Sequence, residues 1–151
     1  MNRQCFKNLK KKLPKYFSSF PIQKEEIIKA ISDNQTNLKK ITDERGSVLH
    51  MIRKDSKIFK SFGEIYFSVS FPSVVKAWHI HKEMTLNYAC IAGSIKLVLY
   101  DNRKNSKTKN EIQEIILSPV NYFLVTVPPL IWNGFMNISE ENSILANCSS
   151  E

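Results

Sequence analysis

The stretch Glu64-Ile-Tyr-Phe-Ser-Val-Ser-Phe71 alternates strictly between polar and apolar side chains. Successive side chains of a β-strand point to opposite faces of the sheet, so this pattern predicts a strand with one apolar and one polar face. The apolar positions are Ile65, Phe67, Val69 and Phe71, and the polar positions are Glu64, Tyr66, Ser68 and Ser70.

Short segments of the same texture recur along the chain, and turn-like sequences such as Ala92-Gly93 and Asp101-Asn-Arg-Lys-Asn-Ser106 separate them. Seven or eight short strands at this spacing predict an all-β sandwich, jelly roll or barrel. The other predicted strands are 47–53, 74–81, 85–92, 94–101, 111–117, 122–128 and 143–148. The four glycines are expected to mark tight turns or close backbone approaches, at Gly46, Gly63, Gly93 and Gly134.

The 151 residues, of which 42% are hydrophobic, suffice for one core and not for two ordinary domains. The net charge of +8 is concentrated at the start of the chain. Residues 1–40 hold ten Lys or Arg against three acids, whereas the remaining 111 residues carry twelve basic and eleven acidic groups. We therefore divide the chain into a basic extension, 1–40, and a nearly neutral barrel, 41–151, and expect no nucleic-acid partner.

The basic extension is expected to be short and partly helical. Apolar residues recur there at helical spacing beside a run of lysines, and the segment 23–40 has a weaker helical pattern. We prefer a helix that packs on the barrel with its lysines in water, and we rank attachment to a membrane surface or an acidic partner below it. The first pattern comprises Phe6, Leu9, Leu13 and Phe17 beside Lys10, Lys11 and Lys12.

The cysteine pattern indicates a reducing compartment. Cys5, Cys90 and Cys148 are far apart and form no CxxC pair, so neither a disulfide framework nor a thiolate metal site is indicated. No stretch reaches the ~18 apolar residues of a membrane span, and no apolar run of a signal peptide follows the basic start. We therefore expect a cytoplasmic protein.

The strongest local feature is Lys76-Ala-Trp-His-Ile-His-Lys82. His79 and His81 are two residues apart in a predicted strand and therefore point to the same face. Inside a barrel, neutral imidazoles serve as metal ligands or as a general base. The alternative is a pair of surface histidines on an edge strand.

Further segments resemble, in order and spacing, the successive motifs of the cupin-type dTDP-4-dehydrorhamnose 3,5-epimerases and their relatives. The resemblance covers roughly residues 41–148. It implies a double-stranded β-helix, usually dimeric, that binds a nucleoside-diphosphate 4-keto sugar inside the barrel. The segments are Asp43-Glu-Arg-Gly46, Phe62-Gly-Glu-Ile-Tyr-Phe67, Val74-Val-Lys-Ala-Trp-His-Ile-His-Lys82, Met84-Thr-Leu-Asn-Tyr88, Ile95-Lys-Leu-Val-Leu-Tyr-Asp101, Val127-Pro-Pro129, Trp132-Asn-Gly-Phe135 and Ala146-Asn-Cys148.

The substrate class implied by this resemblance needs a base, an electrostatic clamp and an acid. A keto group acidifies the hydrogens on adjacent carbons, so a base can remove one if the enolate is stabilised, and an acid on the opposite face can return a proton with inversion. By resemblance, His79 matches the base, Lys76 takes the place of a positive charge near the sugar and phosphates, and Arg45 matches an arginine that holds the nucleotide, often across a dimer interface. A salt bridge with Asp43 or Glu44 is the structural alternative for Arg45.

The chain departs from the epimerases proper at several positions. Their lysine a few residues after the base is replaced by Leu86, and their tyrosine acid falls where this chain has Leu145 to Asn147. Asn133 stands in place of a histidine. The aromatic residue and the acid after their arginine-glycine pair are replaced by Val48 and His50. These differences leave other reactions of the same substrate class open.

Tyr66 offers a replacement acid, because it lies on the polar face of its predicted strand. One tyrosine with an HxH pair resembles the sugar-nucleotide 3,4-ketoisomerases, and a packing tyrosine is the structural alternative. Asn87, Asn133 and Trp132 are assigned to substrate binding, although each asparagine could instead cap a turn.

No metal is expected to be required. Metal-binding cupins follow HxH with a glutamate and a later histidine, and the corresponding positions here are Leu86 and Asn133, while Glu83 has the wrong spacing.

The sequence therefore predicts an all-β cupin, a double-stranded β-helix or jelly-roll barrel with a short helical N-terminal extension. The predicted function is epimerisation of a nucleotide sugar of the dTDP-4-keto-6-deoxyhexose type, without a dissociable cofactor. The predicted catalytic residues are His79, His81 and Tyr66. A 3,4-ketoisomerase and a non-catalytic sugar-nucleotide-binding cupin are the alternatives, and a homodimer is expected in each case.

Overall fold

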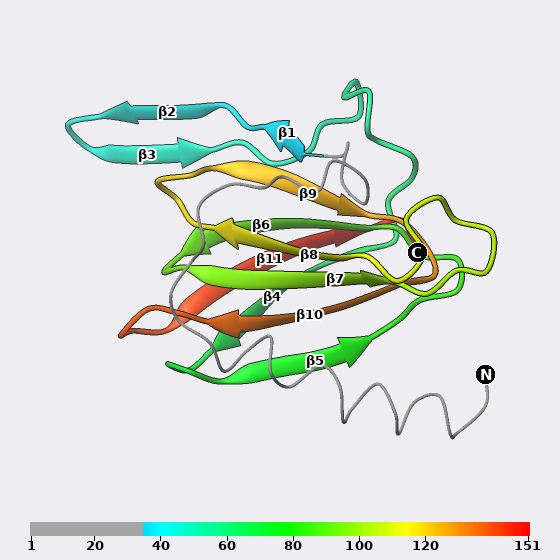
Figure 1. The fold of residues 1–151 in the computed structure, drawn as a ribbon. Helices are drawn as coiled ribbons and strands as arrows, with labels where there is room; N and C mark the ends of the chain where they lie inside the picture. The colour runs from blue at the N-terminus through cyan, green and yellow to red at the C-terminus, as the bar shows by residue number, and fades with distance from the viewer. Residues whose placement is uncertain (1–34) are drawn as a thin grey trace.

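The computed structural model describes residues 35–151, and the predicted helix of the basic extension lies outside them. Strands β4, β6, β9 and β11 form one sheet with β1, while β5, β7, β8 and β10 form a second sheet that faces it (Figure 1). The spatial order in the first sheet is β1 (Gln35–Asn37), β9 (Phe123–Val127), β6 (Leu86–Ala92), β11 (Ser143–Ser149) and β4 (Glu64–Ser70). In the second it is β5 (Val75–His79), β10 (Ile131–Asn137), β7 (Ile95–Asp101) and β8 (Ile112–Leu117).

The chain passes repeatedly from one sheet to the other, and neighbouring strands pair antiparallel. This path is that of a jelly roll, so the expected all-β barrel is confirmed. Residues 35–151 contain no helix, and hence no helix long and apolar enough to cross a membrane.

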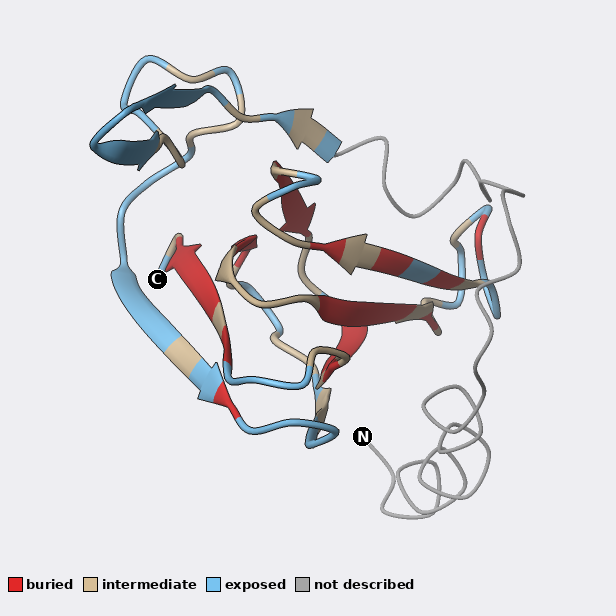
Figure 2. Ribbon diagram, turned by 90° about the vertical axis from the view of Figure 1, so that its left-hand side faces the viewer, coloured by how far each residue is buried: buried red, intermediate tan, exposed pale blue. Residues whose placement is uncertain are grey.

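The core lies between the two sheets. Leu86, Tyr88 and Cys90 of β6 face inward together with Leu97 and Leu99 of β7, and all five are nearly inaccessible to solvent. Two-residue spacing on both strands places these side chains on the inner faces. The buried strands of both sheets surround one continuous core (Figure 2).

Strand β4 turns its polar face inward. Asn147 of β11 pairs with Tyr66 of β4 on one side and with Tyr88 of β6 on the other, and directly opposed residues share a face. Because Tyr88 belongs to the core, Tyr66 also faces the interior.

The apolar face of the same segment is exposed on the outside, and β4 is largely exposed along its length (Figure 2). The exposed fractions are 49% for Ile65, 57% for Phe67, 48% for Val69 and 66% for Phe71. A row of large apolar side chains on a sheet edge is unusual for a lone barrel and indicates an interaction surface.

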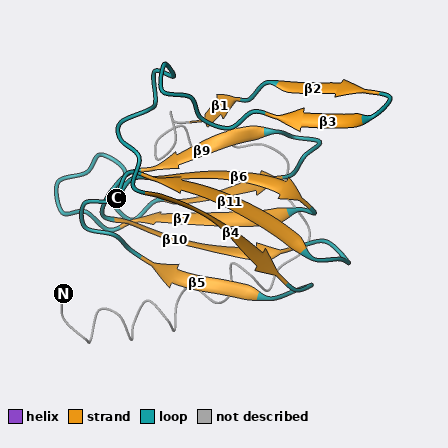
Figure 3. Ribbon diagram, turned by 180° about the vertical axis from the view of Figure 1, so that it is seen from behind, coloured by secondary structure: helices purple, strands orange, loops and turns teal. Residues whose placement is uncertain are grey.

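A two-stranded hairpin, β2 (Lys40–Asp43) with β3 (Gly46–Leu49), extends away from the barrel (Figure 3). Its apolar residues Ile41 and Val48 are exposed. Arg45 lies in its turn, on the other side of the barrel from β5 (Figure 1).

Two segments differ from the sequence-based predictions. Residues 35–37, inside a weakly helical pattern, form β1 and pair with β9, so the barrel sheet begins before residue 41. Residues 131–137 form β10, which the pattern did not predict, because Asn133-Gly134 after a proline pair is typical of a turn. Pairing with β5 and β7 on both sides overrides that local preference.

Gly134 is placed where β5 approaches β10 closely. The pairing register shifts there, and a Cβ at residue 134 would lie 2.5 Å from the Cβ of Ala77. This close approach puts the end of β5, and therefore His79, against Asn133.

We expect Gly134→Ala to lower the free energy of unfolding by about 1–3 kcal/mol, because the added methyl group has no space beside Ala77. Chemical denaturation of the variant measures the loss. The double variant Gly134→Ala/Ala77→Gly is the control and should recover part of it. If the double variant lost as much stability as Gly134→Ala and Ala77→Gly together, the close contact with Ala77 would not be the cause.

Candidate active site

His79 and His81 lie together at the end of β5. His79 is the last residue of this edge strand and pairs with Asn133 of β10, while His81 follows in the adjoining loop. Both line an open cavity of about 700 Å³. The remaining lining residues are Trp78, Ile80, Lys82, Leu130 and Trp132. The two histidines, which the sequence analysis expected on one face of a strand, thus line one cavity from the end of β5 and the loop after it.

The environment of His79 favours the neutral imidazole. Partial burial lowers the pKa of His79 below its ordinary value of 6.5, and the charge of neighbouring His81 lowers it further. A neutral imidazole at the mouth of a cavity has the protonation state that a general base requires near pH 7.

A chain of hydrogen bonds crosses the barrel interior behind His79. The Tyr88 hydroxyl donates to Asn133 Oδ1 at 3.2 Å, and Asn133 Nδ2 donates to the backbone oxygen of His79 at 3.4 Å. Tyr66 lies in the same cross-strand row as Tyr88, on the other side of Asn147. The pKa of Tyr88 is strongly raised, first by burial and then by the charge and hydrogen bond of Tyr66. This network connects Tyr66 on one sheet with the backbone of His79 on the other.

Asn147 completes the polar row between Tyr66 and Tyr88. Its Oδ1 accepts a hydrogen bond from the backbone nitrogen of Asn87 at 3.0 Å. Its Nδ2 is fully buried and has no hydrogen-bond partner among residues 35–151. Asn147 is therefore the position in this row with an unused donor.

Tyr88 and Asn147 were missed by the sequence analysis. Strand alternation puts Tyr88 on one predicted face with Leu86, which indicates a core position and gives no signal of function. Asn147 is an isolated polar residue in an apolar strand, and only the pairing of β11 with both neighbours reveals what it faces.

Lys76 bridges the two sheets at their open edge. Its Nζ donates to Ser68 Oγ at 2.9 Å and to the backbone oxygen of Val69 at 2.7 Å, so the charge of β5 lies against the inner face of β4. Both of these partners are neutral. Lys76 thus brings a positive charge to the side of the interior that also holds Tyr66.

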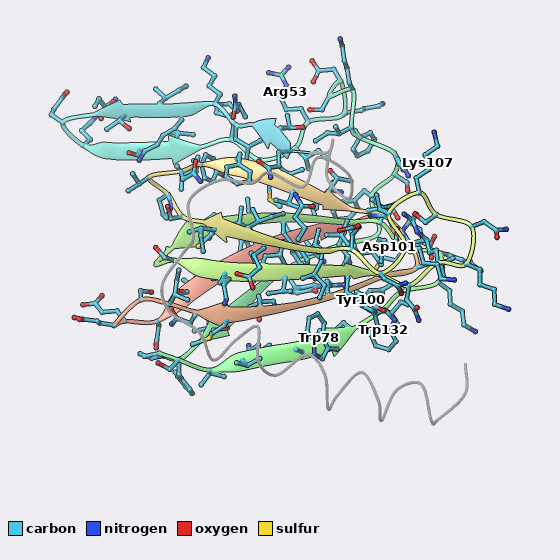
Figure 4. The ribbon with its side chains drawn as sticks, in the orientation of Figure 1. Arg53, Trp78, Tyr100, Asp101, Lys107 and Trp132 are labelled. Carbon is cyan, nitrogen blue, oxygen red and sulfur yellow. The ribbon has the colours of Figure 1, made fainter. Side chains whose placement is uncertain are left out.

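Trp132 forms part of the cavity wall. It is buried beside Tyr100 of the neighbouring strand and shares the cavity with Trp78. The three aromatic side chains come from β10, β7 and β5 and gather at one end of the four-stranded sheet (Figure 4). Trp78 and Trp132 therefore give the cavity an apolar, aromatic wall.

Two predicted binding residues are not brought to this group within one subunit. Asn87 faces away from Tyr88, and its amide donates to Cys148 O at 2.9 Å and accepts from Thr126 Oγ1 at 2.9 Å. Arg45, in the distant hairpin, forms an exposed salt bridge of 2.7 Å with Asp43.

Within the described part of the chain, no group of three or more His, Cys, Asp or Glu residues is placed to hold a metal ion. The donors present around His79 are a second histidine, a tyrosine pair, an amide and a lysine. This set is suited to moving protons and to hydrogen bonding.

We predict that the imidazole of His79 titrates below pH 6.5 in the folded protein. Burial is the larger cause of this lowered pKa and the charge of His81 the smaller, so His81→Gln should raise the pKa of His79. NMR titration of the imidazole resonances measures both values, and His50→Gln, outside the cavity, is the matched control. A His79 pKa at or above 6.5 in the unmodified protein would contradict the environment described.

Comparison with known proteins places these features in a family context. A family model described as dTDP-4-dehydrorhamnose 3,5-epimerase matches residues 32–151. The probable low-salt glycan biosynthesis epimerase Agl13 of Haloferax volcanii is 32% identical over 119 residues, which are 78% of this chain and 74% of that protein. The spore coat polysaccharide biosynthesis protein SpsL of Bacillus subtilis is 32% identical over 103 residues, 68% of each chain.

A solved structure supports the same relationship. The crystal structure of a dTDP sugar isomerase from Desulfovibrio desulfuricans superposes with a TM-score of 0.76 and 42% sequence identity. The superposition covers 78% of this chain and 75% of that one.

Proposed function

The chain belongs to the dTDP-4-dehydrorhamnose 3,5-epimerase family, and we propose that it is an isomerase that epimerises a nucleoside-diphosphate 4-keto sugar in the cavity beside His79. The observation that carries this proposal is a neutral imidazole at the cavity, while the facing sheet turns Tyr66 toward the barrel interior. Epimerisation next to a keto group needs a base and an acid on opposite faces of the reacting carbon.

In the proposed reaction, His79 removes the proton from the carbon next to the keto group. The electron pair of that C–H bond forms the enolate double bond, and the carbonyl oxygen becomes negative. Lys76 stabilises this charge, because neutral partners hold its ammonium group at the open edge between the two sheets. Tyr66 then gives its proton to the opposite face of the carbon, and the proton held by His79 returns to Tyr66 through solvent.

The remaining predicted residues have supporting roles in the proposal. His81 lowers the pKa of His79, and Asn133 holds the His79 backbone. Trp132 supplies an apolar wall for the sugar nucleotide. Asn87 holds the backbone of β11. We expect the protein to work in a reducing cytoplasm, where the buried thiols of Cys90 and Cys148 stay free.

Proton exchange in heavy water tests this proposal. With dTDP-4-keto-6-deoxyglucose, the unmodified protein should wash deuterium into a carbon next to the keto group and release an epimer. His79→Ala should slow exchange by about 10²-fold or more, because a general base contributes that much, while His50→Ala should leave it unchanged. Unaltered exchange in His79→Ala would remove His79 from the mechanism.

The products distinguish the alternatives. A 3-keto isomer of the sugar would identify a 3,4-ketoisomerase. Binding of the sugar nucleotide without exchange in the unmodified protein would identify a non-catalytic binding protein.

We further propose a homodimer in which Arg45 of one subunit reaches the cavity of the other. The exposed apolar face of β4 provides the contact surface, and the projecting hairpin carries Arg45 away from its own cavity. Burying such a face between two copies would remove the apolar edge from water. The subunit that supplies His79 would then receive its nucleotide-binding arginine from the partner subunit.

Phe67→Asp should convert this dimer to a monomer, because a carboxylate at the centre of the apolar face cannot be buried unpaired. Light scattering coupled to gel filtration measures the mass. Glu64→Asp, which changes a polar residue on the other face of the same strand, is the matched control.

Mixing Arg45→Ala and His79→Ala subunits tests the sharing of the site. Each variant alone should be impaired, and reassociated mixed dimers should regain activity, because one of their two sites then contains both intact residues. No recovery after verified exchange of subunits would contradict a shared site.

A further inference from the structure

We propose that Tyr88 is a positioning residue that holds the acid Tyr66 and stabilises its phenolate through a hydrogen-bond chain anchored on Asn133. This inference rests on the proposed epimerase function. It assigns a role to a buried core tyrosine that the reaction described above does not use.

The first support is the position of Tyr88 between the two sheets of the barrel. Strand register places Tyr66, Asn147 and Tyr88 in one row across three strands of the first sheet. From the end of this row, the Tyr88 hydroxyl reaches across to Asn133 on the second sheet. Tyr88 therefore lies between the acid and the residue that holds the backbone of the base.

The second support is that Tyr88 is rigid. It is 3% exposed, and its ring packs edge-on against Phe135, with centroids 6.5 Å apart and an interplanar angle of 63°. When the ring is fixed in this way, the main remaining motion is rotation of the hydroxyl hydrogen about the C–O bond, which lets it point to either partner. The hydroxyl oxygen stays in place between Tyr66 and Asn133.

The third support is chemical. Burial keeps the Tyr88 phenol protonated, so it remains a donor throughout the reaction. In the resting protein it donates to Asn133 Oδ1. Once Tyr66 has given its proton to carbon, the Tyr88 hydrogen can turn to the new phenolate oxygen and stabilise its charge.

Asn133 allows the Tyr88 hydrogen to turn while the other hydrogen bond of the Asn133 amide is kept. Its Nδ2 stays bonded to the backbone oxygen of His79 while Oδ1 releases and regains the Tyr88 hydrogen. The chain then returns to its resting arrangement when Tyr66 takes up a proton. No bond to carbon is made or broken by Tyr88 itself.

The test separates proton removal from inversion. The full chain carrying Tyr88→Phe is incubated with dTDP-4-keto-6-deoxyglucose in heavy water, and deuterium incorporation and the inverted product are measured together. We expect exchange by His79 to stay within about twofold of the unmodified protein, whereas inversion falls about tenfold or more at unchanged KM. A loss of both in equal proportion, or of neither, would overturn the proposal.

Two further variants sharpen this result. Tyr66→Phe should show the same split between exchange and inversion, and Tyr66→Phe/Tyr88→Phe should be no worse than Tyr66→Phe alone, because Tyr88 acts through Tyr66. Additive losses would contradict that dependence. Tyr122→Phe, which alters a hydroxyl that is buried without a partner among residues 35–151, is the matched control and should change neither readout.

The controls also keep this inference distinct from the proposed function. Absence of exchange in the unmodified protein would reject the epimerase itself and not merely the role of Tyr88. Phenylalanine fills the same core space as tyrosine, and a melting curve checks the fold. If Tyr88→Phe does not fold, Tyr88→Met takes its place, because methionine also lacks the hydroxyl and adapts to the core space, and the same split between exchange and inversion is expected. An unchanged ratio of exchange to inversion in that variant would contradict the proposed role of the Tyr88 hydrogen bonds.

Discussion

The register of β11 between β4 and β6 is the constraint on which the site depends. A shift of one residue would move every side chain of a strand to the other face. In the observed register, Asn147 lies between Tyr66 and Tyr88, so three polar groups occupy one row of an otherwise apolar interior. The same register turns the apolar residues of β4 outward.

In this arrangement, polar groups that serve the proposed reaction occupy positions that apolar core residues could fill. Buried polar groups are costly unless they are hydrogen-bonded, and most of those near the cavity are. Asn133 uses both ends of its amide, and Lys76 places its ammonium group against two oxygens. The unused donor of Asn147 is the exception among the described residues of this row.

The sequence predicted the main elements of the candidate site and missed the contacts that join them. His79 and His81 were found because two histidines at strand spacing in a polar segment are a local signal. Tyr66 was found from alternation within its own strand. Tyr88 is part of the apolar core and Asn147 lies in an apolar strand, so neither had a local signal of function. Their role follows from cross-strand pairing over long sequence separations, as between Tyr88 and Asn133.

The sequence by itself determined the all-β class, most strand positions, the family and the histidine pair, because period-two alternation and motif order are properties of neighbouring residues. Tertiary structure decided that residues 131–137 form a strand, that β4 presents its apolar face outward, and that the hairpin carrying Arg45 lies on the other side of the barrel from β5. The physical reason is that pairing partners and facing sheets lie far apart in the sequence. Which side of a strand is inside, and which polar groups meet there, is set only when those partners come together.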